Sequence, residues 1–314
     1  MAGYVVGRAL QAVPVVLLAS IAVFLILRLV PGDPAQALAG EGATEARIEE
    51  IRHQLGLKDS WPEQYLRWVS HLLRGDLGTS LQSGLSVGRL LKLSFPPTLE
   101  LAVAAYLFAI VVGIPLGVAA GVAPRSVWDW VLSGYTMVTV GVPNFLLGTL
   151  LLWAFAVSLG WFPIAGRVSF FDDPASSIRY LVLPALALGS GQAAVLARYT
   201  RTSINQTMGQ DFIRTARAKG LPNGAVVFHH ALRASLIPVV TIMALQVGQL
   251  LAGAVVVEQV FTRPGLGRLV VVAIGGRDYP VVQSTLVVFV SIFVSVNLAA
   301  DVASGLLDPR VSRR

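Results

Sequence analysis

The sequence contains no cysteine among its 314 residues. This absence excludes disulfide bonds, thiolate metal sites, iron–sulfur ligation and cysteine nucleophiles. Lysine is also rare, because Lys58, Lys92 and Lys219 are the only three, and none of them follows a glycine. A Walker A loop needs a Gly-Lys pair to hold phosphates, so the chain carries no such loop. If ATP drives this protein, another polypeptide hydrolyses it.

Charged residues are scarce, at 13% of the chain, whereas soluble domains average about 25%. Hydrophobic residues make up 55%, and the mean hydropathy is +0.70. This composition indicates an integral membrane protein. The formal charge of +7 is then expected to reflect the orientation of the loops and not the binding of nucleic acid.

A complete set of catalytic or metal-binding residues is also missing. The histidines are His53, His71, His229 and His230, and none has a second histidine four residues away, as a metal-binding helix requires. We therefore predict that the chain is not an enzyme and that it binds no metal or cofactor of its own.

Six apolar runs are long enough to cross about 30 Å of hydrocarbon as helices. The third lies within a long uncharged stretch and should end near Gly160. We expect the first run to be a retained helix, because it exceeds the core of about 7–15 residues that a cleaved signal has. The six runs are Ala9–Leu27, Leu101–Val122, a span within Val131–Gly166, Leu181–Ala197, Ala234–Val257 and Tyr279–Ala300.

Two further segments do not fit a membrane span. Residues 31–97 mix charges of both signs with the aromatic anchors Trp61, Tyr65 and Trp68. Helical spacing of Ile48, Ile51 and Leu55 before Gly56 predicts a small extramembrane subdomain with amphipathic helices. A long solvated loop is the alternative. The apolar run Leu269–Gly276 is too short to cross, so it is predicted to be interfacial or re-entrant.

The positive-inside rule orients the six spans. With the amino terminus inside, the short inner segments hold eleven basic residues against Asp129, Asp211 and Asp308. The 31–97 segment holds seven bases, but loops of that length cross largely regardless of charge. Both termini and the segment Gln210–Pro238 are therefore predicted to be cytoplasmic. The inner basic residues are Arg8, Arg125, Arg198, Arg201, Arg214, Arg217, Lys219, Arg233, Arg310, Arg313 and Arg314.

The segment Gln210–Pro238 predicts a short helix, a turn and a second helix. Asp211 suits the first turn and Lys219 the last, since each complements the helix dipole. Gly220-Leu221-Pro222 stops the helix, and Asn223 is a suitable N-cap for the next one. In the second helix we expect His229, His230 and Arg233 on the wet face, opposite Phe228, Leu232 and Leu236. The alternative is a basic loop that merely obeys the positive-inside rule.

Polar residues inside apolar runs are costly to bury and often functional. Gln246 and Gln249 lie three residues apart, so we expect them to share a helix face and, with Asn144, to line a translocation path. Hydrogen bonding between helices is the alternative for each amide. Pro115, Pro143 and Pro184 lie in or beside spans and are expected to shape packing.

An ordered series of motifs resembles the inner-membrane permease subunits of ATP-binding-cassette importers, specifically the B-type permease of dipeptide, oligopeptide and nickel systems. The resemblance covers essentially the whole chain, and such a series is far more specific than any one motif. The motifs are Pro31-Gly32-Asp33-Pro34, Gly75-Asp76-Leu77-Gly78-Thr79-Ser80, Pro97-Thr98-Leu99-Glu100-Leu101, Val142-Pro143-Asn144-Phe145, Leu183-Pro184-Ala185-Leu186, Arg214-Thr215-Ala216-Arg217-Ala218-Lys219-Gly220, Phe261-Thr262-Arg263-Pro264-Gly265-Leu266-Gly267, Arg277-Asp278-Tyr279-Pro280 and Leu307-Asp308-Pro309-Arg310.

The resemblance implies an all-α fold of type I importer permeases with about six transmembrane helices. The domains would be an N-terminal helix (1–30), an extracytoplasmic subdomain (31–97), a core permease domain (98–307) with a cytoplasmic coupling loop (201–237), and a cytoplasmic tail (308–314). The motif Arg214–Gly220 would correspond to the loop whose short helix docks on the ATPase subunit. The generic motif has Glu-Ala-Ala where this chain has Arg214-Thr215-Ala216, so no role falls to a glutamate.

The resemblance also implies partners in a bacterial plasma membrane. These are a second, homologous permease in a heterodimer, two ATPase subunits that bind ATP and Mg, an extracytoplasmic substrate-binding protein and the lipid bilayer, with no nucleic acid. Peptides are the expected substrate, and nickel chelates, glutathione and haem are the alternatives. From another class, an ion-coupled secondary transporter would normally carry an ionisable group at mid-bilayer, and the centres of these runs have none.

Overall fold

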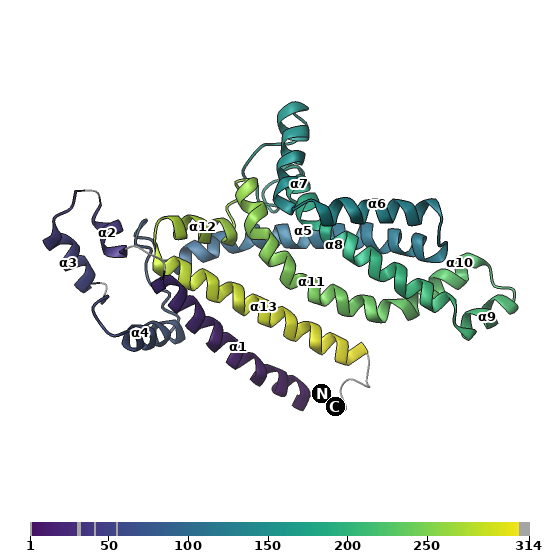
Figure 1. Cartoon of the computed structure of the whole chain (residues 1–314), viewed down its shortest axis with the longest axis horizontal. Helices are drawn as coiled ribbons and strands as arrows, with labels where there is room; N and C mark the ends of the chain where they lie inside the picture. Colours follow the sequence, from purple (N-terminus) through teal and green to yellow (C-terminus); the bar gives the residue numbers. More distant parts are fainter. Residues whose placement is uncertain (1, 30–32, 41, 55, 308–314) are drawn as a thin grey trace. The chain divides into compact units, whose positions relative to one another are not determined.

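In the computed structural model the chain is built almost entirely of helices (Figure 1). The structure describes residues 2–307 except 30–32, 41 and 55, so the predicted tail 308–314 lies outside the described residues, as does Leu55. The described elements are α1 (Ala2–Leu29), α2 (Pro34–Ala39), α3 (Glu45–Gln54), α4 (Trp61–Leu73), α5 (Val87–Val122), α6 (Val127–Gly141), α7 (Asn144–Leu151), the π-helical η1 (Leu152–Ser158), α8 (Pro174–Met208), α9 (Asp211–Ala218), α10 (Asn223–Ala225), the π-helical η2 (Val226–Ala231), α11 (Leu232–Val260), α12 (Leu266–Gly275) and α13 (Tyr279–Leu307).

Five of the helices, namely α1, α5, α8, α11 and α13, are long and apolar enough to cross a membrane. They confirm five of the six predicted spans. The short helix α12 has ten residues, which confirms that the apolar run at this position is too short to cross.

The third predicted span is formed by two helices with a bend between them and not by one straight helix. The pair α6 and α7–η1 passes the span criteria only together, and it is bent by 103° at Val142-Pro143. Proline has no amide hydrogen and disfavours helical geometry in the residue before it, so the helix ends at Gly141. The second half ends at Ser158, close to the predicted end near Gly160.

Two spans are longer than their apolar runs. The helix α8 extends from Pro174 to Met208, so Arg179 and Arg198 lie inside it and do not bound it. Its start is fixed by Asp173, whose side chain accepts hydrogen bonds from the amides of Ala175 and Ser176. Charged residues limit the part of a helix that can lie in hydrocarbon, but they do not end the helix itself, because straight-chain residues such as arginine are good helix formers. The same argument applies to α5.

The chain divides into two compact units, each described here by itself. The first holds Thr98–Arg263 and the chain from Val296 on, and the second holds Ala2–Pro97 and Pro264–Ser295. In the first unit α8 contacts α6, α7 and α11, and 67% of its apolar window is buried, against 22–33% for the other spans. The core of the second unit joins α1, the start of α5, α12 and α13 through Leu27, Val87, Leu91, Leu266, Val270, Ala273, Val281 and Val282.

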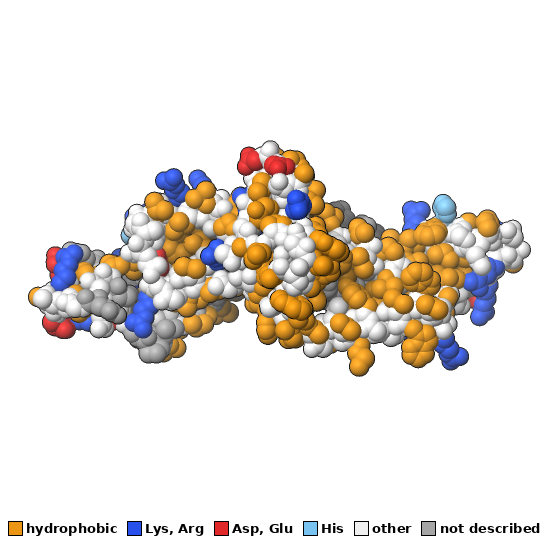
Figure 2. Space-filling view, turned by 90° about the horizontal axis from the view of Figure 1, so that it is seen from above, with side chains coloured by type: hydrophobic (Ala, Val, Ile, Leu, Met, Phe, Trp, Pro, Cys, Tyr) orange, Lys and Arg blue, Asp and Glu red, His pale blue; other side chains and the backbone are white. Residues whose placement is uncertain are grey.

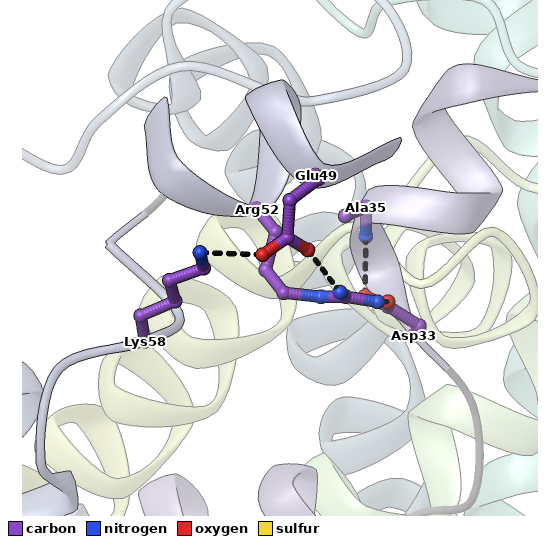
Figure 3. A network of polar contacts seen from close by, with 5 residues as sticks. All are labelled: Asp33, Ala35, Glu49, Arg52 and Lys58. Atoms are coloured by element: carbon purple, nitrogen blue, oxygen red, sulfur yellow. Dashed lines mark hydrogen bonds and ion pairs between the residues drawn. The ribbon is translucent and has the colours of Figure 1, made fainter. Parts of the chain in front are cut away.

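A small polar network holds α2 and α3 together in the second unit (Figure 3). Asp33 caps α2 by accepting the Ala35 amide at 2.8 Å, and it also pairs with Arg52 of α3. Glu49 pairs with both Arg52 and Lys58. Burial alone would raise the pKa of Asp33, but the hydrogen bonds from Arg52 and from the Ala35 amide lower it below its usual value.

The predicted subdomain is therefore helical, with Ile48 and Ile51 buried together. Among its expected aromatic anchors, Tyr65 and Trp68 pack on Phe24 of α1, at ring-centroid distances of 5.5 and 6.3 Å. Trp61 is instead 50% exposed, because it occupies the first turn of α4. Two of the three anchors are confirmed and the third is wrong.

The loop before α5 is tied to the α12–α13 corner by one carboxylate. Asp278 is 2% exposed and accepts hydrogen bonds from the Ser80 hydroxyl, the Leu81 amide at 3.1 Å and the Gln82 amide at 3.4 Å. The motifs Gly75–Ser80 and Arg277–Pro280 thus meet in space, although they lie about 200 residues apart.

A second buried network lies in the first unit, and we refer to it as the Glu100 network. Glu100 accepts hydrogen bonds from Arg167 at 3.0 Å and from Arg263 at 2.6 Å. Thr98 donates its hydroxyl hydrogen to Glu258 at 2.6 Å, and Glu258 is 0% exposed. Burial lowers the pKa of the Arg263 guanidinium, and the charge of Glu100 opposes that shift. Glu258 and Arg263 are thus fully buried, whereas Glu100 and Arg167 each keep about a fifth of their side-chain exposure.

Glycines on α5 allow α8 to approach closely. Gly113, Gly117 and Gly121 repeat every four residues and therefore share one helix face. A Cβ on each would lie 2.8, 2.5 and 2.8 Å from a backbone carbonyl oxygen of α8. Small residues of this kind let membrane helices pack backbone to backbone, and the face that they form is named here the glycine face of α5.

Substituting alanine for Gly117 should destabilise this pair measurably. Its Cβ would lie 2.5 Å from the Ala197 carbonyl oxygen and 2.6 Å from Thr200 Cβ, both closer than normal contacts. We expect a loss of about 1–3 kcal/mol, the usual range for overpacking, seen as a lower melting temperature of the purified protein in detergent. Gly134→Ala is the matched control, because nothing lies within 4 Å of its Cβ position. Equal melting temperatures for both variants would contradict the prediction.

Candidate functional site

The helix α9 begins and ends almost where the sequence predicts. Asp211 stands in its first turn, and the Thr215 hydroxyl donates to the Asp211 carbonyl at 3.0 Å. The helix ends at Ala218, one residue before the expected Lys219. Gly220 follows with a φ of +78°, which L-residues with side chains adopt reluctantly, so the chain leaves the helix there.

Two side chains fix α9 to the rest of the first unit. Ile213 is 0% and Ala216 is 5% exposed, and both belong to a cluster with Val118 of α5, Ile204 of α8 and Val226 of η2. An eight-residue helix is too short to be stable alone in water. The helix therefore owes its place to these contacts with three other elements.

The opposite face of α9 is exposed and carries Arg214 and Arg217. Figure 2 shows several Lys and Arg side chains near the α9–α10 end. Of the seven residues predicted as the coupling motif, Ala216 is buried and the other six are exposed. The exposed ones are Arg214, Thr215, Arg217, Ala218, Lys219 and Gly220.

Phe212 is a member of this surface that sequence reasoning missed. Its side chain is 45% exposed, although the next residue, Ile213, is fully buried. Successive residues of an α-helix point about 100° apart, so on a short helix with only a narrow buried side one of two adjacent apolar residues can face outward. The adjacency of Phe212 and Ile213 in the sequence is therefore the signal that could have placed Phe212 on this surface.

The segment after Pro222 departs from the predicted α-helix. It forms the single turn α10 and then η2, whose π-helical bonds skip one residue more than α-helical bonds do. Val226, Val227 and Ala231 are buried, and Phe228 is 64% exposed. The prediction that Phe228 lies on the packed side was therefore wrong, because an i, i+4 pattern counted back from Leu232 fails across a π-helix. His229, His230 and Arg233 are exposed, as expected.

The two stems of this segment are joined to each other. The Ser203 hydroxyl of α8 donates to the Ser235 carbonyl of α11 at 2.9 Å, and the Ser235 hydroxyl bonds the Thr207 hydroxyl at 2.9 Å. Arg201 of α8 also pairs with Asp129 of α6 at 2.7 Å. The segment thus projects from a base in which three helices are linked.

The three residues predicted to line a path have different environments. Asn144 begins α7, and its side-chain amide lies against Gly191 of α8 and Gly253 of α11. Gln246 is 3% exposed and donates to the Gln192 carbonyl at 3.2 Å, whereas Gln249 is exposed. Gln246 therefore bonds between helices, and it differs in burial from Gln249, which lies three residues further along α11. A role in lining a path stays a prediction for all three.

One serine has the spacing of a hydrolase nucleophile elbow, Gly84-Leu85-Ser86-Val87-Gly88. An elbow places its serine between a β-strand and a helix. Ser86 instead forms an isolated bridge with Thr79, and its carbonyl accepts the Arg89 and Leu90 amides at the start of α5. In the described residues this motif is a turn before a helix.

Comparison with known families covers nearly the whole chain. Residues 113–313 match the family described as "Binding-protein-dependent transport system inner membrane component". Residues 1–102 match the family of its N-terminal part, "Binding-prot-dependent transport system membrane comp, N-term".

Curated relatives align over 99% of both chains. The chain is 42% identical over 313 residues to the glutathione transport system permease protein GsiC of Salmonella paratyphi A. It is 41% identical over 311 residues to a putative peptide transport system permease protein of Brucella suis biovar 1. It is 37% identical over 311 residues to the probable peptide ABC transporter permease protein y4tP of Sinorhizobium fredii.

Solved structures share the fold at low sequence identity. The inward-facing MetNI methionine ABC transporter matches with a TM-score of 0.58 and 20% identity, over 70% of this chain and 96% of that one. An amino acid ABC transporter with histidines matches with a TM-score of 0.52 and 16% identity, over 71% and 94%.

Proposed function

The chain belongs to the binding-protein-dependent transport system inner membrane component family, and from this premise we propose that it moves peptides through its membrane. As a member, it is a multi-pass permease subunit of an ABC importer and not an enzyme. The substrate proposal is supported by relatives that are named peptide and glutathione permeases at 37–42% identity. Glutathione is itself a small peptide, so both names point to one chemical class.

The partners follow from what the chain lacks. It has no phosphate-binding loop, so two ATPase subunits would bind ATP and Mg and hydrolyse the nucleotide. A second homologous permease would complete the path, most simply as a heterodimer, and a substrate-binding protein would deliver peptides. Both termini and α9 would face the cytoplasm, since the short segments on that side hold eleven basic residues against three acidic ones.

The observation that supports a coupling role in ATP-driven transport is the way in which α9 is built. Its inner face is buried through Ile213 and Ala216, and its outer face presents Phe212, Arg214 and Arg217. Movement passes between subunits only through a contact that resists deformation, and α9 is held by three elements. We assign this outer face to the ATPase, with Phe212 as an apolar contact among cations.

Transport by the reconstituted importer tests the assignment. Replacing Arg217 by alanine removes an exposed cation, and Gly220→Pro forces φ to about −65°, which the observed +78° excludes. Each should lower ATP-driven uptake of a labelled peptide about tenfold or more, the scale of an interface hot spot. ATP hydrolysis should persist, because the nucleotide sites lie in other subunits.

Arg233→Ala is the control, since Arg233 is exposed on the same segment but outside α9. Normal peptide uptake by the Arg217 and Gly220 variants, in importers that assemble fully, would overturn the assignment of α9. Uptake of a nickel chelate or haem in place of peptides would overturn the substrate and leave the assignment of α9 intact.

A further inference from the structure

A groove of about 820 Å³ opens on the second unit. It is lined by the loop before α5 at Gly75 and Leu77, by the first turns of α5, by Leu266 of α12 and by Val288 of α13. All of these residues belong to one compact unit. The groove plays no part in the function proposed above.

Two cations stand at the α5 side of the groove. Arg89 and Lys92 both line it, both are exposed, and neither forms an ion pair with a described carboxylate. Their spacing of three places them on the same face of the helix. In the same unit Arg52, Lys58 and Arg67 are each paired with an acid, and Arg89 and Lys92 differ from these three.

The remainder of the groove is largely apolar and runs into the membrane zone. Leu77, Leu91, Phe95, Leu266 and Val288 supply its apolar surface. Val288 lies within the candidate span Tyr279–Ala299, about 14 Å along the helix axis from Tyr279. Tyrosine is typical of a membrane interface, so the groove extends from interface level toward hydrocarbon depth.

We propose that this groove binds an anionic phospholipid. The phosphate would accept charge-assisted hydrogen bonds from Arg89 and Lys92, and an acyl chain would lie along Phe95, Leu266 and Val288. A lipid matches both halves of the site, because it alone among the surroundings of a membrane protein joins a negative head to a long apolar tail. The surrounding bilayer also supplies it at high concentration. Basic pockets between membrane helices bind anionic lipid heads on the cytoplasmic side of membranes, and the same pairing of cations with a phosphate would apply to this groove.

Lipid retention by the purified importer tests the proposal. The complete importer is placed in nanodiscs of equal phosphatidylglycerol and phosphatidylcholine, released by mild detergent, and examined by native mass spectrometry. Phosphatidylglycerol should be retained in preference to phosphatidylcholine. The R89A/K92A variant should weaken that retention about thirtyfold, since each cation near a membrane surface contributes about fivefold.

A second variant tests the apolar part. Gly88 lines the groove, and its Cβ position meets only ordinary contacts, so Gly88→Phe should fold and fill the groove. It should lose the bound lipid while keeping both cations. The matched control R47A/K58A removes two cations from α3 and the loop that follows it, and should retain the lipid.

Three results would overturn the proposal. The first is unchanged phosphatidylglycerol retention in both groove variants, and the second is an equal loss of both lipids in R89A/K92A. The third is a loss of stimulation by the substrate-binding protein with lipid retention unchanged, which would assign the groove to a protein partner.

Discussion

Replacing Arg263 by alanine is expected to lower the free energy of unfolding by about 3–5 kcal/mol, the cost of breaking a buried ion pair. The Arg263 side chain is 1% exposed and donates to Glu100. The backbone amide of Arg263 also donates to the Glu258 carbonyl at 2.8 Å, so this residue closes the end of α11. Its removal leaves two carboxylates in the Glu100 network with one arginine instead of two.

The measurement is the melting temperature of the detergent-purified permease, which should fall by roughly 6–20 °C. Arg263→Lys keeps the charge but loses the planar fork that donates several hydrogen bonds, so an intermediate loss is expected. Arg167→Ala is the comparison within the network, because the Arg167 side chain is 20% exposed and water can replace part of its contact. An Arg263→Ala protein that melts with the wild type would refute a stabilising role for this network.

Truncating Ile213 to alanine is expected to release α9 and abolish coupled transport. The side chain is fully buried, and such truncations cost about 2–5 kcal/mol. That loss is comparable to the total free energy contributed by the contacts that hold this eight-residue helix, which has no independent stability. Peptide uptake should therefore fall more than with Arg217→Ala, which removes the proposed docking contact but leaves the helix in place.

Ile213→Val provides a graded control, because it costs about 0.5–1.5 kcal/mol and should leave most uptake intact. Hydrogen exchange of the α9 amides gives an independent readout. Fast exchange in Ile213→Ala with slow exchange elsewhere would show local release and not global unfolding. Wild-type peptide uptake together with fast hydrogen exchange of the α9 amides would contradict the proposal that α9 transmits movement as a rigid element.

The helical spans were predictable because hydrophobic runs of this length have few alternatives to a membrane helix. The break at Val142-Pro143 was readable in principle, since proline disfavours helix in the residue before it. It was missed because the uncharged stretch continued on both sides. The extension of α8 through Arg179 and Arg198 was missed for a related reason: charge bounds a membrane window but leaves the helix intact.

The contacts that fix the fold were beyond sequence reasoning. Nothing in the local pattern pairs Glu100 with Arg263, or Ser80 with Asp278, because these partners lie between 163 and 198 residues apart. In α9 the first and last residues of the helix were predictable from Asp211 and Gly220. Which of its residues are buried and which are exposed was not predictable. Ala216 and Ala218 look alike in sequence, and only the first is buried.

The glycine face of α5 has a mechanical consequence. Val118 and Ile204 share a buried cluster with Ile213 of α9, and they belong to the two helices that this face joins. Because the backbones interlock at Gly113, Gly117 and Gly121, neither helix can slide along the other without lifting over a row of carbonyl groups. A push on α9 is then borne by both helices together. Two interlocked helices would therefore share any force that α9 passes into the membrane, and together they bend less than either helix alone.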